Sequence, residues 1–126
     1  MYLVDTNILI YYFNDSIPTS EKDKINNIFK SYFNISIITE MEFLGYKHHT
    51  KLSFEKAKTF ISNADVLNIN REIAKHVINI RKQYSIKLPD AIIASTSMKN
   101  NLTLVTRNVK DFSNLNCAIY NPFQQY

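Results

Sequence analysis

Four carboxylates that lie far apart in the sequence could share one active site: Asp5, Glu42, Asp90 and Asp111. Acids that a fold brings together repel one another, so they need a bound cation or raised pKa values. A hard divalent ion such as Mg²⁺ or Mn²⁺ suits a pocket made of oxygen ligands. Such an ion lowers the pKa of its bound water and neutralises charge that grows on a phosphate. These residue types therefore predict metal-dependent hydrolysis of phosphodiester bonds.

The elements that must position these acids alternate between strands and helices. Short β-prone runs occupy residues 2–4, 34–38, 66–69, 102–105 and 118–120. Between them lie helical patterns, with predicted starts at Asp5 or Thr6, at Thr19, at Thr39, at Ser53, at Asn70 and at Pro89. This alternation predicts an α/β domain whose central, mostly parallel sheet is covered by helices on both faces.

Parallel sheets form their sites just beyond the carboxyl ends of the strands. Asp5 directly follows the first predicted strand, and Glu42 lies about one helical turn after the second. Asp90 falls in the first turn of a helix, and Asp111 lies three residues beyond the Thr106–Asn108 segment that follows the fourth strand. We therefore expect the four acids to gather at one rim of the sheet.

Each acid also has a purely structural interpretation. Asp5 could cap a helix, Asp90 could complement a helix dipole, Glu42 could be an exposed helix acid and Asp111 could brace a turn. These four interpretations leave the predicted gathering at one edge unexplained.

Composition restricts the class of protein. The 126 residues, 45% of them hydrophobic, fit one domain spanning residues 1–126. The lone Cys117 allows no intramolecular disulfide, and the lone Gly45 excludes a glycine-rich phosphate loop. The N-terminus does not read as a signal peptide and no apolar run is long enough to span a bilayer, so we expect a cytoplasmic protein without a membrane partner. The net charge of +4 favours a nucleic-acid partner and fits scattered surface lysines equally well.

Read together, four ordered segments resemble a PIN domain, and within that family a VapC-like toxin of a type II toxin–antitoxin system. The segments are Val4–Ile10, Ile38–Tyr46, Leu88–Ala94 and Leu104–Phe112, and the closing Ile119–Phe123 is similar to the tail of many such toxins. The resemblance implies a three-layer α/β/α sandwich and an Mg²⁺- or Mn²⁺-dependent endoribonuclease. It also implies a cognate antitoxin protein and a homodimer.

The resemblance also implies roles for individual residues. Asp5, Glu42 and Asp90 become the acids that organise the metal, with Asp5 and Asp90 as its ligands. Thr6, Asn7 and Thr106 become supporting polar groups.

The fourth acid departs from the family pattern. Some members carry an acid where this chain has Asn108, which supplies no charge and is assigned a supporting polar role. Asp111 is the candidate that replaces it, acting through a metal-bound water.

Other polar residues near these motifs have weaker claims to the site. Glu40, two positions before Glu42 on a helix, should point away from the site. His48 and His49 diverge on a helix and read as surface or loop residues, and Arg107 is either a phosphate contact or a plain surface residue.

Two alternative functions remain open. An aspartyl-phosphate enzyme would want a second acid at Asn7, and a non-catalytic PIN-like module that binds RNA or protein would be consistent with Asn108.

Overall fold

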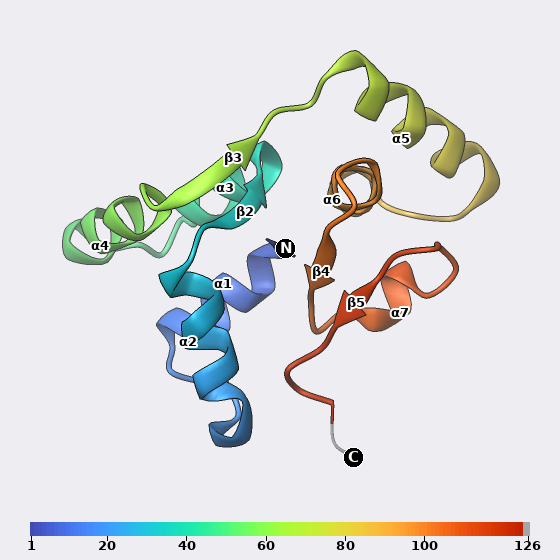
Figure 1. Ribbon diagram of the computed structural model, residues 1–126. Helices are drawn as coiled ribbons and strands as arrows, with labels where there is room; N and C mark the ends of the chain where they lie inside the picture. Colours follow the sequence, from blue (N-terminus) through green and yellow to red (C-terminus); the bar gives the residue numbers. More distant parts are fainter. Residues whose placement is uncertain (125–126) are drawn as a thin grey trace.

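The structure, a computed structural model, describes residues 1–124 (Figure 1). Its strands form one sheet in the order β3-β2-β1-β4-β5, and every neighbouring pair is parallel. The strands are β1 (Tyr2–Val4), β2 (Phe33–Ser36), β3 (Ala64–Leu67), β4 (Thr103–Val105) and β5 (Ile119–Tyr120). The predicted α/β fold with a parallel sheet is confirmed.

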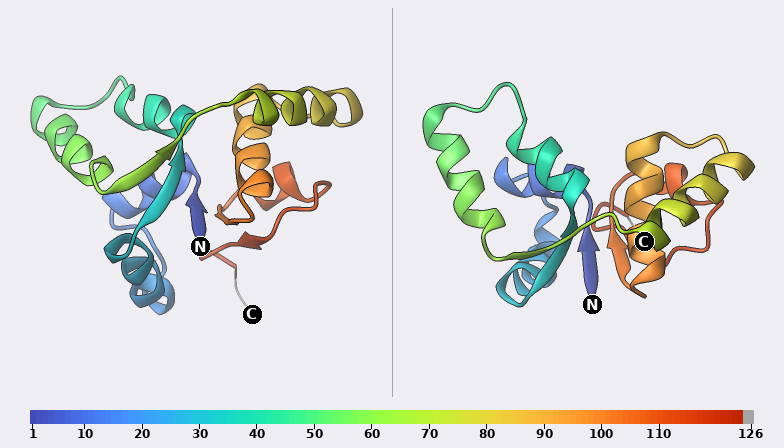
Figure 2. Two further views of the ribbon diagram at one scale, coloured as in Figure 1. Left: turned by 45° about the horizontal axis from the view of Figure 1, so that its top comes forward. Right: turned by 90° about the horizontal axis from the view of Figure 1, so that it is seen from above.

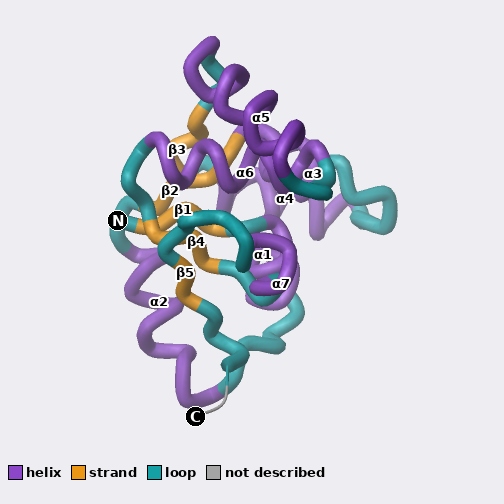
Figure 3. Tube along the Cα trace, turned by 90° about the vertical axis from the view of Figure 1, so that its right-hand side faces the viewer, coloured by secondary structure: helices purple, strands orange, loops and turns teal. Residues whose placement is uncertain are grey.

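Helices connect the strands and cover both faces of the sheet. They are α1 (Thr6–Phe13), α2 (Lys22–Lys30, preceded by the 3₁₀ turn η1, Thr19–Glu21), α3 (Ile37–Leu44), α4 (Lys51–Ile61), α5 (Arg71–Gln83), α6 (Leu88–Lys99) and α7 (Val109–Phe112). In Figure 2, α1, α2 and α4 lie on one side of the strands, and α5, α6 and α7 lie on the other. Figure 3, seen from the side of α5, α6 and α7, shows the strands in a row from β3 to β5. A sheet with helices on both faces is the predicted three-layer sandwich.

Strands β1 and β4 bury both of their faces, which explains their continuous apolar sequence. Val4 and Val105 join the core beneath α1, α2 and α4. Their neighbours Leu3 and Leu104 point the opposite way and join Ile93 of α6 in the second core. Side chains alternate between the faces of a strand, so three residues are enough to link both cores.

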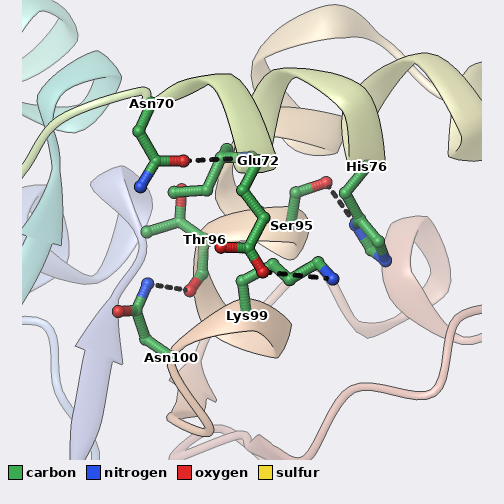
Figure 4. Close-up of polar contacts among 8 residues, drawn as sticks. Asn70, Glu72, His76, Ser95, Thr96, Lys99 and Asn100 are labelled. Carbon is green, nitrogen blue, oxygen red and sulfur yellow. Dashed lines mark hydrogen bonds and ion pairs between the residues drawn. The ribbon is translucent and has the colours of Figure 1, made fainter.

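Helix α5 is attached through α6. Ile73 and Val77 of α5 pack with Ala91 and Ile92 of α6 in a third apolar cluster. Figure 4 shows the polar contacts at the edge of this interface, where His76 Nδ1 lies 2.8 Å from Ser95 Oγ and Lys99 Nζ lies 3.6 Å from Glu72 Oε1. Burial and the nearby Lys99 lower the pKa of His76, which favours its neutral ring.

Several predicted helix starts are correct. The Asp5 side chain caps α1, and the Asn70 side chain caps α5 by accepting from Ile73 N at 2.8 Å. Pro89 lies in the first turn of α6, where proline leaves no helical hydrogen bond unmade.

Two predicted starts are wrong. Thr39 was expected to cap the helix that carries Glu42, but α3 begins at Ile37 and is capped by Ser36, whose hydroxyl accepts from Ile38 N at 3.2 Å. The buried Ser36 ends β2 and caps α3. The β-branched pair at 37 and 38 therefore lies in the helix and not at the end of the strand, where it was expected. Ser53 is not the start of α4 but its third residue, paired with the cap Thr50 in a capping box.

No helix within residues 1–124 is long and apolar enough to cross a membrane. That the whole of 1–126 is one domain stays a prediction, and residues 125 and 126 lie outside the described part.

Candidate active site

Asp5 lies at the carboxyl edge of the sheet, directly after β1, and only 4% of it is exposed. Its Oδ1 accepts from Thr6 N at 2.8 Å, and its Oδ2 accepts from the Thr106 hydroxyl at 2.8 Å. Its own backbone N donates to Val105 O at 2.9 Å. The carboxylate is therefore fixed between the ends of two neighbouring strands, β1 and β4.

Thr106 links Asp5 to the segment that follows β4. It is fully buried, and while its hydroxyl donates to Asp5, its oxygen accepts from Asn108 N at 3.0 Å. The backbone of Asn108 thus holds the Thr106 side chain in place.

Glu42 joins the same edge from α3. The Thr6 hydroxyl lies 2.7 Å from Glu42 Oε1 and 3.1 Å from the Thr39 hydroxyl. Since a hydroxyl has one proton, Thr6 donates to Glu42 and accepts from Thr39. Thr39 was not among the predicted site residues, although it precedes Glu42 by three positions and therefore shares its helix face.

Asp90 and Asp111 lie on the other side of this edge. Asp90, in the first turn of α6, is half-buried, whereas Asp111, in α7, is exposed. Both line one cavity of about 390 Å³ together with Lys87 and Lys110. Sequence reasoning did not predict α7 or this cavity.

The charges of the four acids act on one another. The pKa of Asp5 is raised to about 6. Burial raises it most, the hydrogen bonds from Thr106 and Thr6 lower it, and the negative charges of Asp90 and Glu42 raise it. Burial also raises the pKa of Asp90, as do Asp111 and Glu42, while Lys87 lowers it. Each of the four predicted acids thus contributes to one shared electrostatic site.

The donor set suits a hard divalent ion that keeps most of its own waters. Asn7 Oδ1 is buried with no hydrogen-bond partner among residues 1–124, although buried polar atoms are normally paired. No three His, Cys, Asp or Glu side chains in that range are close enough to enclose a metal directly. Mg²⁺ is commonly held by one or two carboxylates with waters completing its shell, and Asp5 and Asp90 could supply those two.

The remaining candidates lie elsewhere. Glu40 forms no hydrogen bond or salt bridge within residues 1–124, in contrast to Glu42. His48 is exposed, while the ring of His49 is held by Phe43 O at 2.8 Å and Ser53 Oγ at 2.9 Å. The Arg107 guanidinium stacks 4.3 Å from the ring centroid of Phe123, beside the edge that carries Thr106.

Comparison with known proteins agrees with this geometry. The PIN domain family matches residues 2–116. The chain therefore belongs to the PIN domain family. Among curated proteins none matches significantly.

Solved structures extend the comparison over the whole chain. A toxin–antitoxin complex from Klebsiella pneumoniae contains a chain 32% identical, with a TM-score of 0.81 over 99% of this chain and 100% of that one. DNA-bound VapBC from Salmonella typhimurium is 26% identical, with a TM-score of 0.76 over 96% and 97% of the two chains. VapBC2 from Rickettsia felis, bound to a DNA fragment from its promoter, is 25% identical, with a TM-score of 0.77 over 95% and 97%. The predicted resemblance to VapC-like PIN toxins is confirmed.

Proposed function

We propose that this chain is a divalent-metal-dependent endoribonuclease and the toxin of a toxin–antitoxin pair. The observation that carries the proposal is that Asp5, Glu42, Asp90 and Asp111 act on one another at one edge of the sheet. There burial and, to a smaller extent, the neighbouring acids raise the pKa values of Asp5 and Asp90. PIN domain toxins are typically nucleases. A site that accumulates negative charge favours a bound cation.

In this proposal the protein's own groups have distinct tasks. Asp5 and Asp90 hold Mg²⁺ or Mn²⁺, and Thr106 and Thr6 N keep the Asp5 carboxylate in one orientation. Glu42, oriented by Thr6, and Asp111 orient waters around the ion. When bound, the ion would supply an activated water and neutralise charge on the phosphate under attack.

The partners follow from the relatives. Since the similar structures are complexes with antitoxins, we propose that this chain is inhibited by a cognate antitoxin protein. A homodimer and a cytoplasmic location stay predictions, and light scattering at high protein concentration tests the first.

The test is cleavage of RNA by the purified chain in Mg²⁺ or Mn²⁺ and in EDTA. We expect cleavage only with the metal, and loss of at least about a hundredfold in Asp5→Asn and Asp90→Asn, since even outer-shell changes at metal sites cost 10- to 100-fold. Glu40→Gln is the matched control and should cleave normally. Cleavage by Asp5→Asn in EDTA would contradict the mechanism. RNA binding without cleavage in any metal would identify the chain as the alternative, a binding module.

A further inference from the structure

The cavity that holds Asp90 and Asp111 extends well beyond those two acids. It has a volume of about 390 Å³ and runs from the end of α5 along the 84–87 connection to α7. Its other lining residues are Arg81, Tyr84, Ser85, Ile86, Lys87, Lys110, Asn114 and Leu115. Figure 1 shows the α5–α6 connection and α7 on the same side of the sheet. The cavity therefore leads from the acidic edge of the sheet to the surface formed by the end of α5, the 84–87 connection and α7.

The outer part of this cavity is cationic. Arg81, Lys87 and Lys110 all line it, and none of them forms a salt bridge within residues 1–124. Arg81 Nε donates to Ile86 O at 3.3 Å, so this side chain also folds back over the 84–87 connection. Lys87 lies close enough to Asp90 to lower its pKa. Three cations beside the acids suit an anion that extends away from the metal site, as a polynucleotide does.

One aromatic side chain shares the cavity with these cations. Tyr84 follows α5 in extended backbone, and 39% of it is exposed. It takes part in none of the ring pairs found among residues 1–124, whereas Tyr11 and Tyr12 do. A half-exposed ring beside basic side chains is the usual arrangement of single-stranded nucleic-acid sites, in which bases stack on aromatics and cations hold phosphates.

We propose that this cavity is a subsite for one unpaired nucleotide next to the bond that is cut. Tyr84 stacks on its base, and Arg81, Lys87 and Lys110 hold its phosphates. The proposal rests on the proposed ribonuclease function and adds a substrate class to it. A base that stacks on Tyr84 is no longer free to stack in a duplex, so the subsite selects single-stranded segments, loops or bulges.

The test measures RNA binding apart from cleavage. A fluorescently labelled single-stranded RNA is titrated with the Asp5→Asn protein in EDTA, and anisotropy reports the dissociation constant. Adding Tyr84→Ala should weaken binding about tenfold, as expected for one lost base stack, and Tyr84→Phe should restore it. Tyr32→Ala, on the loop before β2 and 75% exposed, is the matched control and should leave binding unchanged.

Salt dependence tests the cations separately. Lys87→Ala and Lys110→Ala should each reduce the slope of log K against log salt by about one, and Tyr84→Ala should not change it. Normal RNA binding by Tyr84→Ala overturns the proposal even if Lys87→Ala weakens binding, because cations alone would equally hold an acidic protein segment. Equal affinity for single-stranded and fully duplex RNA also overturns it.

These results separate the subsite from the ribonuclease function. A chain that cleaves RNA in Mg²⁺ but is insensitive to Tyr84→Ala has the function without the subsite. A chain that never cleaves RNA but loses binding in Tyr84→Ala has the subsite without the function.

Discussion

The two sides of the acidic edge differ in how tightly the fold holds them. On one side, Asp5 is 4% exposed and bonded to Thr6 N and to Thr106, which ties together the ends of β1 and β4. On the other side, Asp90 and Asp111 come from helices and border a cavity lined by cations. Asp90 is half-buried and Asp111 is exposed.

This difference indicates that the two sides hold their negative charges at different costs in folding stability. The buried side holds negative charge in one fixed place at a cost in folding stability, because burial raises the pKa of Asp5. The open side holds its charges at a lower cost, since Asp90 is only half-buried and solvent screens the exposed Asp111. Substitution of Asp5 on the buried side should therefore change both stability and activity, and substitution of the exposed Asp111 on the open side should change activity alone.

The largest effect should come from Asp5→Asn. Its pKa is raised from 3.8 to about 6, so ionised Asp5 costs the metal-free protein roughly 3 kcal/mol. The folded state binds the Asp5 proton more tightly than the unfolded state does. The stability that results is fully present below about pH 4 and is lost as pH rises through about 6. In EDTA at pH 7.5 the variant should be more stable than the wild type while its activity falls at least about a hundredfold. Thermal unfolding followed by circular dichroism between pH 4 and 8 measures the gap in stability between Asp5→Asn and the wild type.

Two outcomes would break this part of the comparison. Identical unfolding of Asp5→Asn and wild type at pH 7.5 would mean that Asp5 is not a source of buried charge. A gap that persists at pH 4 would assign the stability difference to packing instead. Adding Mn²⁺ to the wild type should raise its stability at pH 7.5, and Asp5→Asn should gain much less.

The next effect should separate Glu42 from Glu40. Glu42→Gln removes a charge that raises the pKa values of Asp5 and Asp90, and it weakens the contact with Thr6. Activity should fall roughly 10- to 100-fold. The decrease in stability between pH 4 and pH 7 should also be smaller in Glu42→Gln than in the wild type. Glu40→Gln, two residues away, should match the wild type in both measurements, and equal losses in the two variants would refute the assignment.

A smaller effect is expected from Thr106→Val, which keeps the shape of the side chain and removes its hydroxyl. Asp5 loses one donor and Asn108 N loses its acceptor, so the pKa of Asp5 should rise. We expect activity to fall about tenfold and to recover partly at higher pH. The control is Thr103→Val on β4, the strand that Thr106 follows. If Thr103→Val lowers activity as much, the loss reflects disturbance of β4 rather than of Asp5.

The smallest effect should come from the open side, in Asp111→Asn. Its charge raises the pKa of Asp90, but it is exposed and therefore screened. Activity at limiting Mn²⁺ should fall about fivefold, the scale of a single Coulomb interaction near 1 kcal/mol, and saturating Mn²⁺ should restore it. Stability should not change, and Asp65→Asn on the exposed side of β3 is the control. A loss as large as that of Asp5→Asn would end the distinction between the two sides.

Much of the fold was predictable because its signals are local. The strand at Tyr2–Val4, the caps at Asp5 and Asn70 and the proline in the first turn of α6 each depend on a few neighbouring residues. The two wrong starts arose where adjacent residues offered competing caps. Ser36 and Thr39 could both begin α3, and the choice of Ser36 is decided by where β2 leaves the sheet.

At the candidate site, local sequence signals pointed to the acids but not to the groups that surround them. The ordered motifs and strand-end positions predicted that Asp5, Glu42, Asp90 and Asp111 gather at one edge, since residues after parallel strands meet there. The structure brings their charges close enough to act on one another, and their roles in a site stay predictions. Thr39 and the Arg81, Lys87 and Lys110 cations were not recognised as part of the site, because each reads locally as an ordinary cap or surface residue.

The sequence by itself therefore determined most of the elements, their alternation and the positions of acids near the strand ends, all properties of local pattern. Only the tertiary structure decided which groups meet. Strand β1 pairs with both β2 and β4, which brings Thr6 to Glu42 across 36 residues and Thr106 to Asp5 across 101. Strand order is a property of the whole packed sheet, and no short segment encodes it. For that reason the buried hydrogen bonds around Asp5 and the cavity beside Asp90 were visible only in the folded chain.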